Sequence, residues 1–164
     1  FNVNTRAPFI LMQDSIKIMI RENIKGSILN ILSMAMHSGM PFLAAYSASK
    51  AALANMTKNT ANAVAGHNIR VNALNIGWTD TPGEDVIQKK FHEGGDDWLQ
   101  KAEKKVPFKR LTKALDVARA AAYFCSDESG LTTGSIIDYD QTVLGWHSYS
   151  GYDTKILDDS LLGE

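Results

Sequence analysis

The spacing of apolar residues along the chain predicts three helices. In each, apolar positions recur every three to four residues, so that one face of the helix is hydrophobic. Asn4 or Thr5 can cap the first helix, Asp116 can cap the third, and Gly66 is placed to end the second. The predicted helical segments are 4–23, 43–65 and 116–125.

Three short apolar runs lack this helical period and are predicted to be strands; the first suits a strand that is buried on both faces, and the second is also expected to be buried. These runs are 27–32, 69–75 and 135–139. Helices and strands therefore alternate, which is typical of an α/β fold with a parallel sheet and right-handed crossovers. Because three strands cannot cover the apolar faces of the helices, we expect further strands or a partner chain.

Residues 77–108 interrupt this alternation with a polar, irregular stretch. Gly77, Pro82, Gly94 and Pro107 divide it into short helical pieces. A connection of this length within a compact domain is often a lid over a substrate. We therefore predict a substrate lid at 77–108.

The composition narrows the classes of function. Seventeen basic and eighteen acidic residues give a net charge of −1 without a basic block, so neither nucleic acid nor a membrane is expected as a partner. Cys125 is the single cysteine, which excludes an internal disulfide and favours a reducing, cytoplasmic location; its apolar helix predicts that it is buried. The four histidines show no metal-ligand spacing, so no catalytic metal is expected.

The strongest chemical signal lies between Ser33 and Lys50. Ser33 precedes Tyr46 by thirteen residues, and Lys50 follows that tyrosine by four, which places both side chains on one helix face. A nearby ammonium favours a phenolate, and a serine after a strand can hold a substrate oxygen against it. A half-buried tyrosine beside a solvated lysine is the ordinary alternative. Ser47 and Ser49 are the rival serines, but they face away from Tyr46.

The segments GSILNILS at 26–33 and AYSASK at 45–50 resemble the region around the active tyrosine of the short-chain dehydrogenase/reductase family. The resemblance covers nearly the whole chain and implies part of a doubly wound, Rossmann-type parallel sheet with helices on both faces. No glycine-rich nucleotide-binding motif occurs in the sequence. We therefore expect 1–164 to be the catalytic, C-terminal portion of a single Rossmann-type domain, without its nucleotide-binding N-terminal half.

The resemblance also implies roles for the site residues. Tyr46 becomes the general acid/base. Lys50 becomes its electrostatic partner and a ligand of the nicotinamide ribose, and Ser33 the holder of the reacting oxygen. Asn4 matches a fourth catalytic residue that helps to hold a water linking the lysine to solvent. A plain helix N-cap is the competing interpretation of Asn4, and Asn2 is the alternative if the register differs.

Residues 70–82 resemble the motif that follows the sixth strand of the family. By this match, Gly77 lets the backbone pass under the nicotinamide ring. The main chain of Thr79 and the hydroxyl of Thr81 match positions that bind the carboxamide of the nicotinamide. Ile76 stands where the family usually has proline. The implied cofactor is NAD or NADP, and the sequence does not decide between them.

The resulting hypothesis is an NAD(P)-dependent oxidoreductase acting on an alcohol or carbonyl substrate. Residues 134–146 look similar to family members that act on sugars and polyols, so a sugar or polyol is the expected substrate. The alternatives are a 3-oxoacyl thioester reductase, although no basic patch for an acyl carrier protein is evident, and a non-catalytic binding or scaffold protein. The resemblance also implies a homo-oligomer, at least a dimer and by family likeness a homotetramer. The candidate substrate contacts are Met34, His37, Trp78, His92, Trp98 and Trp146.

Overall fold

A three-stranded parallel sheet forms the centre of the computed structural model, which describes residues 1–38 and 40–144 of the chain. The strands are β1 (Ser27–Ile31), β2 (Arg70–Ile76) and β5 (Ile136–Tyr139). Strand β2 lies between the other two, and Ser27 is opposite Arg70 in the register of β1 and β2. Because all three strands run in the same direction, the segments that follow them meet at one edge of the sheet.

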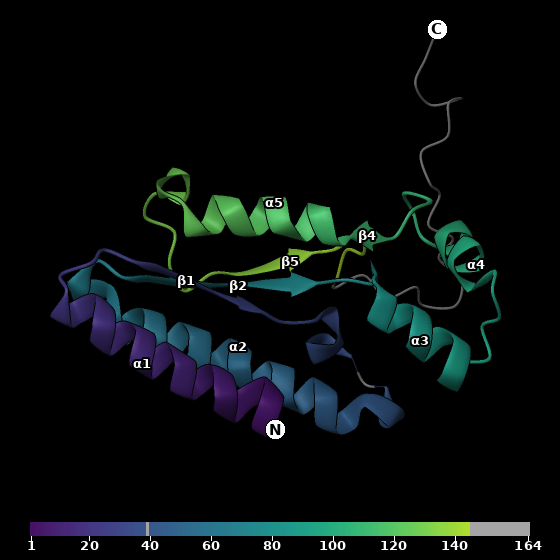
Figure 1. Ribbon diagram of the computed structural model, residues 1–164, viewed down its shortest axis with the longest axis horizontal. Helices are drawn as coiled ribbons and strands as arrows, with labels where there is room; N and C mark the ends of the chain where they lie inside the picture. Colours follow the sequence, from purple (N-terminus) through teal and green to yellow (C-terminus); the bar gives the residue numbers. More distant parts are fainter. Residues whose placement is uncertain (39, 145–164) are drawn as a thin grey trace, which may run out of the picture.

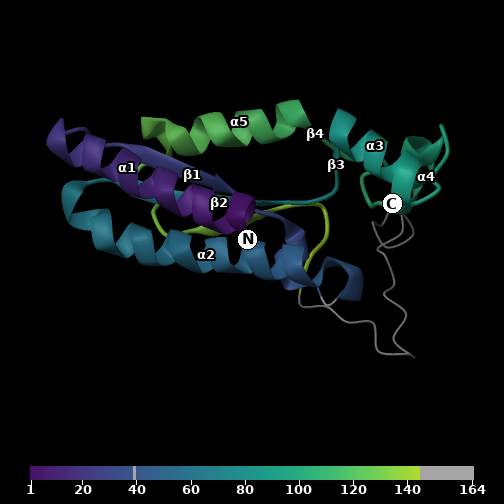
Figure 2. The same cartoon turned by 60° about the horizontal axis from the view of Figure 1, so that its bottom comes forward.

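Helices cover both faces of this sheet, as the alternation predicts (Figure 1). The long helices are α1 (Ala7–Arg21), α2 (Ala44–Val64) and α5 (Ala114–Cys125). Helices α1 and α2 lie side by side on one face and α5 on the other, and the turned view keeps the same two sides apart (Figure 2). The predicted α/β architecture with a parallel sheet is therefore confirmed.

The main core fills the space between the sheet and the pair α1 and α2. Its buried members are Met12, Leu32, Leu53, Ala54, Ala61, Val64, Ile69, Val71 and Ala73. Small side chains on α2 let that helix approach the sheet closely. Polar contacts within this core satisfy a buried amide: Asn30 of β1 donates to the Thr57 hydroxyl at 2.9 Å and to the Met12 sulfur at 3.3 Å.

The stretch predicted as a lid folds into two short helices beyond the carboxyl end of the sheet (Figure 1). Its elements are β3 (Thr79–Asp80), α3 (Pro82–Phe91) and α4 (Trp98–Lys105), and β4 (Thr112–Lys113) follows shortly after its end. Strands β3 and β4 pair in parallel and close the base of the stretch. A small core of its own holds it together, formed by Trp98, Ala102 and Leu111.

Two predicted helix ends differ from the structure. Gly66 does not end the second helix, because a 3₁₀ turn at Ala65–His67 continues it and Asn68 then takes the left-handed conformation, with φ of 57°. Asp116 is not the cap of the third helix. The N-cap is Lys113, and Asp116 is the third residue of α5. The Asp116 carboxylate accepts a hydrogen bond from the backbone N–H of Lys113 at 2.9 Å.

Two predictions of burial are wrong. Strand β1 is not buried on both faces, because within the described chain it is an edge strand and only Asn30 among its five residues is buried. Cys125 is exposed rather than buried. Helix α5 has no buried residue, since it packs on a narrow sheet that covers little of its surface.

Candidate active site

Ser33 lies just beyond the carboxyl end of β1 and begins a tight turn. Its backbone is extended, and its hydroxyl accepts a hydrogen bond from the N–H of Ala35 at 3.2 Å. This caps the 3₁₀ turn η2 (Met34–His37). The serine hydroxyl is therefore held in a fixed turn and keeps its own proton to donate.

Tyr46 and Lys50 occupy the first two turns of α2. The Tyr46 side chain is 38% exposed, and the Lys50 Nζ lies 5.8 Å from the centre of its ring. Lys50 also donates to the backbone oxygen of Ile31 at 2.9 Å, and its partial burial lowers its pKa. Ile31 is the last residue of β1 and stands two residues before Ser33. The lysine therefore brings the tyrosine helix to the strand end that carries the serine.

Asn4 is not a helix cap, because it lies inside the π-helical turn η1 (Asn2–Arg6) that precedes α1, and neither it nor Thr5 caps a helix. Its Nδ2 donates to the Ser49 hydroxyl at 3.2 Å, and that hydroxyl donates to the Tyr46 backbone oxygen at 2.6 Å. Thr5 donates to the Ser49 backbone oxygen at 3.1 Å. The competing N-cap interpretation is therefore wrong, and Asn4 contacts the tyrosine helix.

Ser49 was weighed only as a rival to Ser33, and sequence reasoning assigned it no role in the site. Its side chain is buried, with 1% of its surface exposed. It nevertheless connects Asn4 to the Tyr46 backbone. A cavity of about 320 Å³ lies beside this connection, between the start of α1, β1 and α2, and both Asn4 and Lys50 line it. No local pattern distinguishes such a serine, because the connection exists only once α1 and α2 pack.

Gly77 follows β2 at the same sheet edge. A Cβ at this position would collide with the Asp140 carboxylate and lie 2.8 Å from the Asp140 Cβ, so no side chain fits. Thr79 donates from its hydroxyl to the Gly77 oxygen at 2.9 Å, and the Thr81 hydroxyl accepts from the N–H of Glu84 as the cap of α3. The three predicted cofactor contacts therefore form one ordered turn.

Two of the three tryptophans predicted to contact substrate meet within residues 77–108. Trp78 and Trp98 stack with ring centres 6.3 Å apart, and each indole N–H donates to a carboxylate of α3, Trp78 to Glu84 and Trp98 to Asp85, both at 2.7 Å. Trp98 is 4% exposed, whereas Trp78 is 39% exposed. The buried ring of Trp98 therefore packs against the ring of Trp78, and of the two only Trp78 presents a substantial indole surface to solvent.

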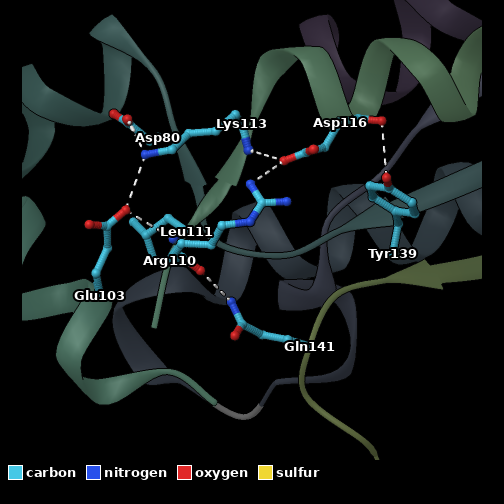
Figure 3. Close-up of polar contacts among 8 residues, drawn as sticks. All are labelled: Asp80, Glu103, Arg110, Leu111, Lys113, Asp116, Tyr139 and Gln141. Atoms are coloured by element: carbon cyan, nitrogen blue, oxygen red, sulfur yellow. Dashed lines mark hydrogen bonds and ion pairs between the residues drawn. The ribbon is translucent and has the colours of Figure 1, made fainter. Parts of the chain in front are cut away.

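Ion pairs and hydrogen bonds attach the stretch predicted as a lid to the start of α5 (Figure 3). Lys113 lies between the carboxylates of Asp80 and Glu103, at 2.9 and 3.1 Å. Arg110 pairs with Asp116 at 2.7 Å and, together with the Lys113 backbone N–H, holds the pKa of that carboxyl at about 2. Tyr139 of β5 donates to the Asp116 backbone oxygen at 3.0 Å. Residues 77–108 are thus attached to the start of α5, and Tyr139 attaches α5 to the last strand.

Met34 and His37, also predicted to contact substrate, are held by the sheet. The Met34 sulfur accepts from Asn75 Nδ2 at 3.3 Å, and His37 Nε2 lies 3.3 Å from Asp138 Oδ1. Asn75 and Asp138 were not singled out by sequence reasoning. His92 at the end of α3 lies edge-on to Phe42, with ring centres 6.4 Å apart. Trp146 falls outside the described residues.

Within residues 1–38 and 40–144, no group of three or more histidine, cysteine or acidic side chains is arranged to hold a metal ion. No helix in these ranges is both long and apolar enough to cross a bilayer.

Comparisons with known proteins identify the family of the chain and the type of its fold. A family model described as enoyl-(acyl carrier protein) reductase matches residues 1–143. The 3-oxoacyl-[acyl-carrier-protein] reductase FabG of Thermotoga maritima is 36% identical over 139 residues, which cover 85% of this chain and 53% of that protein. The L-xylulose reductase of Caenorhabditis elegans is 34% identical over 145 residues, covering 85% and 54%.

Among solved structures, 4-hydroxyisoleucine dehydrogenase complexed with NADH superposes with a TM-score of 0.73 at 31% identity. The match covers 85% of this chain and 55% of that one. The chain belongs to the short-chain dehydrogenase/reductase family, and its sheet is part of a Rossmann-type fold. It spans about half the length of the curated relatives that it matches.

Proposed function

We propose that the protein is an NAD(P)-dependent oxidoreductase that interconverts an alcohol and a carbonyl compound, with a sugar or polyol as substrate. The observation that carries this proposal is the Lys50 contact with Ile31. This contact places an ammonium beside the Tyr46 ring and next to the strand end from which Ser33 follows. A phenol, an ammonium and a serine hydroxyl gathered at one sheet edge suit proton transfer at a substrate oxygen.

The protein's own part in the reaction is the handling of that proton. In oxidation, Ser33 holds the alcohol oxygen and the Tyr46 phenolate accepts its proton while the carbinol carbon loses hydride. In reduction, Tyr46 returns the proton to the carbonyl oxygen. Lys50 favours the phenolate, and Asn4 beside the cavity that both line serves as the relay to solvent.

The turn at Gly77 fits a flat nicotinamide ring, which accepts or returns hydride when the cofactor is bound. A glycine is required there because the Asp140 carboxylate already packs against its Cα. Thr79 and Thr81 are the proposed carboxamide contacts, and Lys50 has two further N–H donors for the ribose hydroxyls. This chain binds either NAD or NADP; its 4-hydroxyisoleucine dehydrogenase relative is complexed with NADH.

The lid at 77–108 is proposed to cover the substrate. Trp78 offers an exposed indole face, and Glu84 beside it offers a carboxylate oxygen, a pair that suits the C–H and O–H groups of a polyol. Met34 and His37, on the turn after Ser33, are further proposed contacts of the substrate. The name of the C. elegans relative, L-xylulose reductase, supports this substrate class.

A 3-oxoacyl thioester reductase is the second candidate, because the T. maritima relative carries that name at 36% identity. Absorbance of reduced nicotinamide, followed with the full-length protein, separates the two. We expect turnover with pentitols or hexitols and their keto sugars. Turnover confined to acetoacetyl thioesters would favour the second candidate, and no turnover with any substrate would favour a non-catalytic scaffold.

We also propose a homo-oligomer, a dimer or tetramer, assembled through α1 and α2. Helix α1 exposes large apolar side chains on its outer surface, namely Phe9, Ile10, Leu11, Ile18 and Ile20. Such a surface on a monomer is unusual and marks an association site. Two-fold pairing of α1 and α2 with the same helices of a second copy would cover it as a four-helix bundle. A cytoplasmic location stays a prediction.

A further inference from the structure

The turn that carries Ser33 is tied to the sheet at both of its ends. At its start, Met34 accepts a hydrogen bond from Asn75 Nδ2 on β2, at 3.3 Å. At its end, His37 Nε2 lies 3.3 Å from Asp138 Oδ1 on β5. Asn75 and Asp138 are far from the turn in sequence, so these two side-chain contacts, beside the packing of Met36 on the core, join the turn to β2 and β5.

Both ties lead to the same carboxylate. Asn75 and Asp138 are opposite each other in the register of β2 and β5, and Asn75 Nδ2 donates to Asp138 Oδ1 at 2.7 Å. The His37 contact is solvent-exposed and is weak by itself. Asn75, in contrast, is completely buried, so its bond fixes Asp138 in one place.

The orientation of the Asn75 amide has a cost that packing alone does not explain. Its Oδ1 has no hydrogen-bond partner among the described residues, although the side chain is 0% exposed. Burying a polar atom in this way destabilises a fold. Turning the amide over would aim Oδ1 at the Asp138 carboxylate, which repels it. The amide is therefore held so that Nδ2 serves Asp138 and Met34 together.

Resting on the proposed function, we propose that Asp138 is a positioning residue for Ser33. Through His37 at one end and Asn75 with Met34 at the other, it fixes the turn that aims the serine hydroxyl at the reacting oxygen. Asp138 touches neither Tyr46 nor Lys50 in the described structure, so its effect on proton transfer passes through Ser33.

A double-mutant cycle in the full-length protein tests this route. Asp138→Ala is expected to lower kcat on the order of tenfold, since a small displacement of a reacting group is enough to slow the chemistry. Nucleotide affinity, measured by quenching of protein fluorescence, should not change. In a Ser33→Ala background the same substitution should cause little further loss, because its target is already absent.

Two more variants distinguish positioning from general stability. Asp138→Asn keeps an acceptor oxygen for both donors and should retain most of kcat. Ser27→Ala removes a comparable long-range tie, to the Phe124 backbone oxygen at 2.8 Å, but at the opposite end of the sheet. It should lower thermal stability and leave kcat unchanged. An Asp138→Ala loss that multiplies fully with Ser33→Ala, or no loss at all, would overturn the proposal.

Failure of the proposed function itself would be visible separately, as a wild-type protein without turnover. Hydrogen exchange at the amide of Ala35 would then still test whether Asp138 holds the turn, since this N–H donates to the Ser33 hydroxyl at 3.2 Å. Exchange there should be faster in Asp138→Ala than in wild type and unchanged in Ser27→Ala. Equal exchange in wild type and Asp138→Ala would show that Asp138 does not hold the turn.

Discussion

Lys50 Nζ donates to the backbone oxygen of Ile31 at 2.9 Å, and this bond joins the tyrosine helix to the end of the strand that leads to Ser33. The burial that accompanies the bond lowers the pKa of Lys50, because partial removal from water disfavours the charged ammonium. The ammonium still has two N–H groups to offer. Lys50 lies beside the Tyr46 ring of α2, is bonded to the end of β1, and lines the same cavity as Asn4, the proposed relay to solvent.

Lys50→Met removes this charge and keeps much of the side-chain volume. The phenolate then becomes harder to form, so the pH profile for alcohol oxidation should move to higher pH, and the affinity for nucleotide should fall. Initial rates across pH and a nucleotide titration measure both effects. Lys58→Met, two turns further along α2 at an exposed position, is the control and should change neither. An unmoved profile with normal affinity would argue against both roles of Lys50.

Gly77→Ala tests the turn proposed to lie under the nicotinamide. The new methyl group must displace the Asp140 side chain, so we expect a loss of about 1–3 kcal/mol of unfolding free energy and weaker cofactor binding. Gly66→Ala is the matched control, because nothing lies within 4 Å of a Cβ there. It should raise stability by about 0.4–1 kcal/mol. Urea unfolding of both variants provides the comparison, and equal stabilities would show that the turn tolerates a side chain.

Asp116 provides a pH-dependent test of the lid attachment. Arg110 first, then the backbone N–H of Lys113, hold the pKa of this carboxyl at about 2, below the value of about 3.9 in an unfolded chain. The ionised carboxylate therefore stabilises the fold above about pH 4, and this stabilisation disappears as the pH falls toward 2. Asp116→Asn should be less stable than wild type at neutral pH, and the two urea midpoints should converge between about pH 4 and 2. A constant difference across this range would contradict the assignment.

The sequence predicted the parts of the site that depend on local spacing. Tyr46 and Lys50 are one helical turn apart, so the secondary structure alone brings them to one face. The parallel sheet followed from the alternation of helices and strands. The lid at 77–108, expected from glycines and prolines in a stretch too long for an ordinary connection, stays a prediction.

Tertiary contacts decided what the sequence could not. Asn4 resembled a cap because asparagine caps helices often, but a π-helical turn points it at Ser49 on another helix. Asn75 and Asp138 become neighbours only through the register of two strands. Asn68 rather than Gly66 takes the left-handed conformation, since asparagine also tolerates it and the chain extends by one 3₁₀ turn.

The apolar surface of α1 predicts the state of the protein in solution. Light scattering of the full-length protein should give at least a dimer, because an isologous pairing of α1 and α2 buries side chains that water otherwise surrounds. Phe9→Lys on α1 should shift the protein toward monomer. Phe91→Lys, at a more exposed phenylalanine on the lid, should leave the mass unchanged. A monomer that stays fully active at nanomolar concentration would contradict the assembly.

Tyr46→Phe is the most direct test of the account, because it removes one oxygen from a half-exposed ring and leaves the packing of α2 intact. In the full-length protein, circular dichroism and nucleotide affinity should stay close to wild type. Turnover of the preferred alcohol, followed by absorbance of reduced nicotinamide, should fall by about two to four powers of ten, the usual contribution of general acid–base catalysis. A variant that folds, binds nucleotide and retains near-normal turnover would show that Tyr46 does not transfer the proton.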